Sequence, residues 1–200
     1  MRVQNTFLLR AALATALLAP ALSAQFVPVH QSGLEFGQTA PYEFTLGYSF
    51  LHANAPAGMC GCFSMNQGVG TFVYNAAHGL GVVADVSGGH ANNLSGTSQS
   101  ISLIDYMFGP RYSWKIRSSR YTPYGQALFG ESSELSNYVF AQSVKGFAFM
   151  PGGGLKVRLS PHFGWDVEAG WIHSDIANNA NNRQNDIRIS TGVIFRFAPR

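Results

Sequence analysis

The stretch that decides the fold is Ile187-Arg188-Ile189-Ser190-Thr191-Gly192-Val193-Ile194-Phe195-Arg196-Phe197, close to the C-terminus. Its odd positions are apolar or aromatic apart from Thr191, and its even positions are charged, polar or small apart from Ile194. This period of two predicts a β-strand, because successive side chains of a strand point to opposite faces. Its length is that of a strand that crosses a bilayer at a tilt.

Five further segments show the same alternation, with apolar or aromatic residues gathered on one face. They run through residues 42–50, 80–87, 104–114, 147–159 and 165–172. Two more segments, 68–75 and 121–130, are strand-like, but the sequence does not distinguish their faces. The sequence therefore predicts an all-β protein, an eight-stranded antiparallel up-and-down transmembrane β-barrel, with an even number of strands as such barrels require.

The connections between these segments alternate in length. Residues 76–79, 115–120 and 160–163 form short connections. Longer connections, rich in Asn, Ser, Gly and Gln, cover residues 53–67, 89–99, 131–145 and 174–186. Four long loops at one end and three short turns at the other are typical of an outer-membrane barrel. We therefore expect the long loops to be external and both chain ends to be periplasmic.

Charge separates this prediction from a soluble lipocalin-like barrel or sandwich, the main alternative. Charged residues make up only 12% of the chain, against roughly 25% in soluble proteins. None of them lies on the apolar face of the six segments with readable faces. The opposite face carries five acidic and five basic residues, namely Glu43, Asp85, Asp105, Asp166, Glu168, Arg111, Lys156, Arg158, Arg188 and Arg196. Because buried charges need partners, this balance predicts an ion-pair network inside a closed barrel.

The order of the strands suggests how that network is connected. Lys156 and Arg158 precede a tight turn, and Asp166 and Glu168 follow it on the same predicted face. The basic residues of the closing strand, Arg188 and Arg196, are the next neighbours of these acids in sequence order. We expect the resulting network to fill the barrel.

The N-terminus predicts export. Arg2 and Arg10 precede an apolar run that ends in the small residues Ser23 and Ala24, as in a secretory signal peptide over residues 1–24. Residues 25–40 then form a periplasmic lead-in, and residues 41–197 form the barrel. Without residues 1–24 the chain has 11 Lys and Arg against 10 Asp and Glu. This small surplus predicts no nucleic-acid partner.

No residue pattern indicates a cofactor or a metal site. Cys60 and Cys62 lie in the first long loop, where an oxidising compartment favours a small disulfide and reduced thiols are the alternative. The tight spacing of the two cysteines would strain such a bridge. Gly152-Gly153-Gly154 sits inside a strand, where glycine usually marks a bend or bulge, and it lacks the Lys-Ser/Thr of a phosphate loop.

Three stretches resemble the outer membrane protein β-barrel domain family of OmpA/OmpX type. They are the tail Gln184-Asn185-Asp186 through Phe197, the sequence Phe108-Gly109-Pro110-Arg111-Tyr112, and Thr122-Pro123-Tyr124-Gly125. The resemblance implies a bacterial outer-membrane protein whose partners are outer-membrane lipid and the barrel-assembly machinery. In the family a terminal aromatic residue is often the assembly signal. Here the candidate aromatics are Phe195 and Phe197, and Ala198-Pro199-Arg200 displaces them from the end.

Two functional classes follow. The first is a barrel without enzymatic activity, in a structural, adhesive or weakly pore-forming role, whose external ligand the sequence does not define. The second is a lipid A hydrolase, because Trp171-Ile172-His173-Ser174-Asp175 resembles the His-x-Ser region of lipid A deacylases. Adjacent residues of a strand face opposite ways, so His173 and Ser174 cannot form a nucleophile–base pair. The sequence therefore favours the first class.

Overall fold

A computed structural model describes residues 40–54, 62–92, 100–116, 119–136, 144–176 and 183–197. The predicted signal peptide, residues 1–24, lies outside the described residues, as does the lead-in except for Ala40. Within the described ranges, no helix has the length and apolar character needed to cross a membrane.

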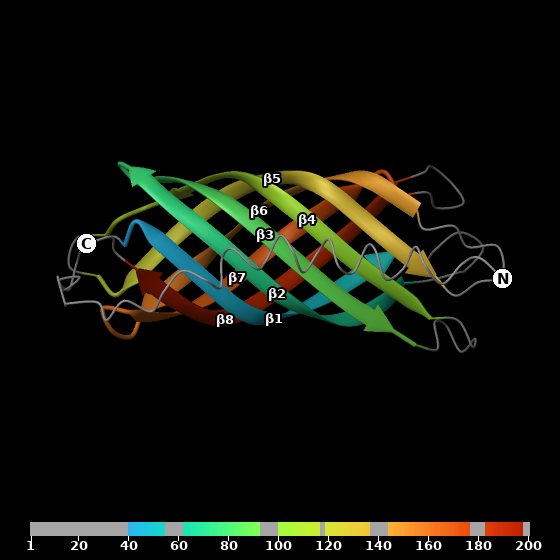
Figure 1. Ribbon diagram of the computed structural model, residues 1–200, viewed down its shortest axis with the longest axis horizontal. Coiled ribbons are helices and arrows are strands. Elements are labelled where there is room, and N and C mark those ends of the chain that lie inside the picture. The colour runs from blue at the N-terminus through green and yellow to red at the C-terminus, as the bar shows by residue number, and fades with distance from the viewer. Residues whose placement is uncertain are drawn as a thin grey trace, which may run out of the picture. The chain divides into compact units, whose positions relative to one another are not determined.

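Eight antiparallel strands form a closed barrel in which each strand pairs with its sequence neighbours and β1 pairs with β8 (Figure 1). The strands are β1 (Tyr42–Asn54), β2 (Cys62–Ala77), β3 (Leu80–Ala91), β4 (Ile101–Ser113), β5 (Tyr121–Ser136), β6 (Val144–Arg158), β7 (Phe163–Ser174) and β8 (Gln184–Phe197). The predicted all-β barrel of eight strands is thereby confirmed. Closure leaves no free sheet edge, which is what a β-structure in lipid requires.

Side chains alternate across the wall as the sequence predicts. Along β8 the buried positions include Arg188 and Arg196, while Ile187 and Ile189 are exposed. Most of the large aromatic and aliphatic residues of the strands are exposed on the outer surface, and this apolar exterior is the reverse of a soluble barrel. The apolar residues seen by sequence therefore face outward, and the charges face the lumen.

Several strands continue further toward the loops than the sequence suggests, β2 and β5 most of all. β2 begins at Cys62 rather than near residue 68, and β5 continues to Ser136 rather than ending near residue 130. Both extensions lie at the loop end, where outward residues such as Ser64 and Asn66 are polar. Their composition is that of a loop although the ladder hydrogen bonds continue, so the prediction placed them in the first and third loops.

The connection between β2 and β3 is tighter than predicted. His78 and Gly79 alone form the turn, with φ values of 53° and 89°. Positive φ at both central residues is the pattern of a two-residue hairpin turn whose twist matches the flanking strands. A side chain at Gly79 would also place its Cβ 2.5 Å from the Ser113 carbonyl oxygen, so glycine is required for two reasons.

Barrel closure brings the two ends of the described chain together, as the blue β1 and dark red β8 of Figure 1 show. Tyr42 is the partner of Phe197, and Glu43 is the partner of Arg196. The ring of Phe195 packs edge-on against Phe163, with centroids 5.5 Å apart. Phe195 and Phe197 therefore lie on the outer surface at the short-turn end, and their role as an assembly signal stays a prediction.

Candidate functional site: the lumen

The ten charged residues predicted for the lumen all lie on inward positions of the strands. Nine of them are buried, and Arg158, near the short-turn end, is half-buried. Arg111 is only 2% exposed and Arg188 only 1%. Side chains of this length reach across an eight-stranded barrel, whose interior is just wide enough for side chains to fill.

Arg188 is the centre of the largest group of interactions. Its Nη1 lies 2.8 Å from Asp85 Oδ1, and its Nη2 lies 3.1 Å from Glu168 Oε1. The other carboxylate oxygen of Glu168 is 3.4 Å from Nη2 of Arg111. Arg111 also donates from Nε to Gln126 Oε1 over 2.8 Å. Two arginines and two acids from four different strands are thus joined across the lumen.

A second group lies nearer the short turns. Lys156 donates a hydrogen bond to Glu43, and Arg196 Nε lies 3.5 Å from the other oxygen of Glu43. The sequence placed Arg196 beside Asp166 and Glu168, and that detail is wrong. Lys156 also departs from its expected partner, because it lies directly opposite Asp166 in the strand register but extends to Glu43.

Tyr124 lies between the two groups, with its ring centre 5.4 Å from Lys156 Nζ, and the sequence analysis did not identify it. The Tyr124 hydroxyl is 2.9 Å from Glu168 Oε2 and 3.0 Å from Asp166 Oδ2, so it donates to either carboxylate. The Arg111 guanidinium lies 4.0 Å from the centre of the tyrosine ring, a cation–π contact. Tyr124 lies on β5, whose faces the sequence did not distinguish. The Thr122-Pro123-Tyr124-Gly125 motif was the available signal.

A glycine makes the position of Tyr124 possible. Gly154 is the partner of Tyr124 on β5 and of Glu168 on β7. A Cβ at Gly154 would lie 2.6 Å from the Tyr124 hydroxyl oxygen. β6 runs through the three glycines without a register shift against β5, so no bulge lies there. Because Gly154 has no side chain, it leaves the space at the barrel wall that the tyrosine occupies.

Asp105 departs from the predicted pairing in another way. Its carboxylate accepts hydrogen bonds from the hydroxyls of Ser87, at 3.2 Å, and Ser132. Asp85, by contrast, combines the ion pair to Arg188 with a hydrogen bond from Thr71 Oγ1 at 2.8 Å. Hydroxyls therefore stabilise Asp105 where the sequence predicted a cation.

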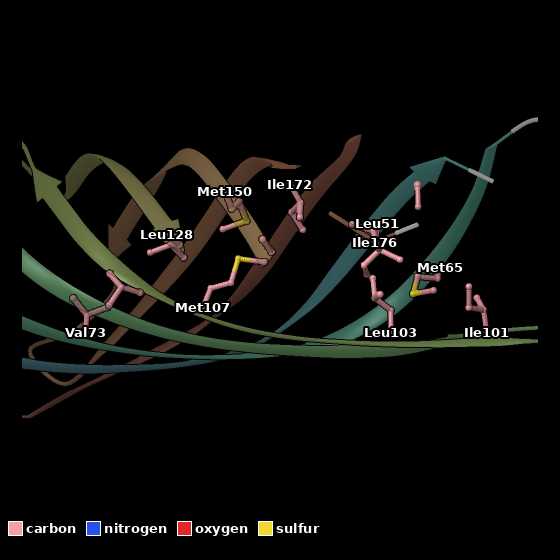
Figure 2. Close-up of a cluster of buried hydrophobic side chains, with 13 residues drawn as sticks. Leu51, Met65, Val73, Ile101, Leu103, Met107, Leu128, Met150, Ile172 and Ile176 are labelled. Carbon is pink, nitrogen blue, oxygen red and sulfur yellow. The ribbon is translucent and has the colours of Figure 1, made fainter. Parts of the chain in front are cut away.

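The sequence predicted that the charged groups fill the lumen. In the structure they fill only part of it. A cluster of buried apolar side chains extends along the lumen (Figure 2). Its members are Leu51, Ala53, Met65, Val73, Val83, Ile101, Leu103, Met107, Leu128, Ala148, Met150, Ile172 and Ile176. Several come from β2 and β5 or from strand ends that the sequence assigned to loops. The lumen therefore holds both paired charges and apolar side chains.

The other candidate residues form no reactive group. His173 faces outward, where Nδ1 donates to Asn185 Oδ1 over 2.8 Å and the ring packs beside Trp171. Ser174 faces inward and is buried. Cys60 and the side chain of Cys62 lie outside the described residues. In the described part of the chain, no three His, Cys, Asp or Glu side chains are grouped to hold a metal.

A closed antiparallel barrel with an apolar exterior and a charge-paired interior defines the class of outer-membrane β-barrels. The sequence matches the Outer membrane protein beta-barrel domain over residues 10–197, and the chain belongs to this family. Its place is therefore the bacterial outer membrane. Among curated protein sequences, none matches the chain.

Solved structures with the same fold include three small outer-membrane barrels. Neisserial surface protein A is 15% identical with a TM-score of 0.61, over 77% of this chain and 97% of that one. Ail, the attachment invasion locus protein of Yersinia pestis, bound to the heparin analogue sucrose octasulfate, is 15% identical with a TM-score of 0.56, over 80% and 100%. OprG from Pseudomonas aeruginosa is 13% identical with a TM-score of 0.52, over 82% and 100%.

Proposed function

We propose that the chain is a closed outer-membrane scaffold that displays its four loop segments at the cell surface, in a structural or adhesive role. The observation that carries this proposal is the occupied lumen. Arg111 and Arg188, the two arginines that cross it, are almost fully buried and bonded to acids on other strands. Moving either side chain to open a path would separate buried ion pairs, which is costly.

The apolar side chains of the lumen support the same proposal. Ions and sugars that entered from the loop end would have to pass the buried side chains of Leu51, Ile101 and Ile172. Passage beside apolar side chains removes water from a polar solute and offers few hydrogen bonds in return. A weak pore would therefore require rearrangement of both the ion pairs and the apolar side chains.

Permeation of small solutes tests the closed state. Liposomes that contain the purified barrel are expected to swell in an arabinose gradient no faster than empty liposomes, while liposomes with a wide porin swell quickly. The double change Arg111→Ala and Arg188→Ala removes the two crossing side chains and serves as an opened comparison. Rapid swelling with the wild-type barrel would refute the closed scaffold and favour a pore.

The loop segments indicate what kind of surface they could contact. The central parts of the long loops, residues 55–61, 93–99, 137–143 and 177–182, contain no Asp, Glu, Lys or Arg; the charged residues of these connections, among them Glu131, Lys145 and Arg183, lie in the strands or next to their ends. Ail is a structural neighbour that binds a sulfated sugar analogue, but a polyanion is recognised chiefly by cationic side chains. An adhesive role for this chain would therefore involve neutral polar partners. A structural role needs no partner.

Binding to immobilised sugars separates these roles. Cells that display the protein are tested on neutral and sulfated oligosaccharides, next to cells whose four loop segments are replaced by Gly-Ser linkers of equal length. Binding to neutral sugars that the linker variant loses would support adhesion. Binding to neither class would support the structural role, and a preference for sulfated sugars would contradict the neutral-loop argument.

Enzymatic activity is not part of this proposal. The His173 ring and the Ser174 side chain are on opposite sides of the barrel wall, so the first cannot take a proton from the second. Incubation of the purified barrel with lipopolysaccharide is expected to release no fatty acid. Release that His173→Ala abolishes would overturn this view and establish a hydrolase.

A further inference from the structure

A repeated feature on the outer surface is not explained by a closed scaffold. Each strand that rises toward a long loop carries a polar, titratable residue ten positions after its first residue. These residues are His52 in β1, His90 in β3, Glu131 in β5 and His173 in β7. Below them, the outward positions of the described strands carry no charged residue. We call these four residues the collar.

Each collar residue is bonded to a polar side chain on the strand that follows the loop. Nδ1 of His52 lies 3.0 Å from Ser64 Oγ, and Nδ1 of His90 lies 2.8 Å from Ser102 Oγ. Lys145 Nζ donates to Glu131 over 2.7 Å. His173 bonds Asn185 in the same way. Because Lys145 neutralises Glu131, the collar itself has no unpaired carboxylate.

The height of the collar places it at the lipid headgroups. Ten residues of a strand that rises about 3.3 Å per residue and tilts by about 40° span roughly 25 Å along the barrel axis. The apolar band of an outer-membrane barrel is also about 25 Å tall. The collar therefore lies where the apolar band ends and the outer-leaflet headgroups begin.

The collar histidines differ in the nitrogen atoms that remain free to bind. Nε2 of His90 lies 2.8 Å from Asn92 Oδ1, so both of its ring nitrogens are bonded within the protein. For His52 and His173, Nδ1 is the nitrogen bonded to a strand partner. Their Nε2 atoms have no such bond among the described side chains. Asn185 adds a donor, because its oxygen accepts from His173 and its amide nitrogen remains.

His52 and His173 frame a single strand. Ile187 of β8 is the register partner of His52 on one side and of Trp171 on the other. Ile189, the next outward residue down, is the partner of Phe50 on β1. The outward face of β8 is thus polar at its loop end and carries exposed branched aliphatic residues below it. Aromatic rings of β1 and β7 lie on either side.

We propose that this face of β8 binds one phosphorylated glycolipid of the outer leaflet. The Ser64 hydroxyl donates to Nδ1 of His52, so Nε2 of His52 donates to the phosphate, as does the Asn185 amide nitrogen. Nδ1 of His173 donates to Asn185, so Nε2 of His173 accepts a hydrogen bond from a sugar hydroxyl. One acyl chain lies along Ile187 and Ile189, between Phe50 and Trp171. The chemistry at the top is hydrogen-bond donation to an anionic oxygen, and the chemistry below is contact between aliphatic and aromatic surfaces. The site does not depend on what the loops bind.

Lipid retention measured by native mass spectrometry tests the proposal. The barrel in detergent is given bis-phosphorylated lipid A or enzymatically dephosphorylated lipid A, and the bound copies are counted. Hydrogen bonds to a charged oxygen are among the strong ones, so the wild type is expected to retain the phosphorylated form about tenfold better. The double change His52→Phe and His173→Phe should reduce this preference to near one. His90→Phe, at the same height but with both nitrogens engaged, should keep it.

Several outcomes would overturn the proposal. One is a wild-type barrel that retains both lipids equally, a result that needs no variant. Another is an unchanged preference for phosphorylated lipid A in the double variant. A third is an equal loss of that preference in His90→Phe, which would mean that the preference is not specific to the face of β8. Heat-modifiable migration shows that each variant is folded. If the double variant does not assemble, His52→Phe alone should lower the preference about two- to threefold.

Discussion

Replacing Glu168 by alanine is expected to lower the free energy of unfolding by about 3 kcal/mol. The carboxylate of Glu168 lies 3.1 Å from an Arg188 nitrogen and 3.4 Å from an Arg111 nitrogen. It also accepts a hydrogen bond from Tyr124 over 2.9 Å. Its removal leaves two guanidinium groups in the lumen with fewer acidic partners.

The magnitude follows from what each arginine retains. Separating a buried pair by removing one partner costs about 3–5 kcal/mol in other proteins. Arg188 keeps Asp85 at 2.8 Å, so its loss is partial. The direct contacts that Arg111 keeps are the Gln126 amide and the face of the Tyr124 ring, which are neutral. Most of the loss is therefore assigned to Arg111, and the lower end of the range is expected.

Chemical unfolding in lipid vesicles, followed by tryptophan fluorescence, measures this effect. Because the cost falls chiefly on Arg111, adding Arg111→Met to Glu168→Ala should restore about half of the lost stability. Adding Arg188→Met instead should restore none, because that change leaves Asp85 without its cation. Glu131→Ala is the matched control, since its pair with Lys145 is exposed and should contribute less than about 1 kcal/mol.

Two results would refute this reasoning. Glu168→Ala with the stability of the wild type would mean that lumen water screens the charges. Equal rescue by Arg111→Met and Arg188→Met would mean that the two arginines are interchangeable and that the observed pairing does not determine stability.

Three further predictions concern the wall and its orientation. Val193→Arg, which places a cation in the outward middle of β8, should cost about 2–4 kcal/mol in vesicle unfolding, while His52→Arg near the interface should cost about 0–1 kcal/mol; equal costs would contradict the inside–outside assignment. Gly154→Ala should cost about 1–3 kcal/mol by displacing a lumen ring, whereas Gly68→Ala, whose added methyl group would meet no heavy atom within 4 Å, should be nearly neutral. Protease added to intact cells should cut within residues 137–143, and cleavage confined to the short-turn end would invert the topology.

Local alternation explains how much of the fold could be predicted. In β1, β3, β4, β6, β7 and β8 the outward side chains are large and apolar, so period two alone assigns both faces. β5 has Pro123, Gly125 and Ala127 on its outward face, and its inward face includes Tyr124 and Leu128. These outward residues of β5 are small and the inward residues include large ones, which is the reverse of the other strands. The local sequence therefore does not show which face is outward.

Contacts across the lumen could not be predicted, because they depend on distance through space rather than on position along the chain. Burial of the charged residues followed from their face of the strand. The choice of partner did not, since Lys156 reaches past Asp166 to Glu43. The relation between Gly154 and Tyr124 joins residues of two strands, and only the barrel places them together.

The closed lumen is tested most directly by the conductance of the wild-type barrel in a planar lipid bilayer. With Arg111 and Arg188 bonded across the interior and apolar residues at the loop end, the barrel is expected to give no steady conductance above the bare bilayer. A large, steady conductance from folded, heat-modifiable protein would contradict the closed lumen and show that ions pass through the barrel.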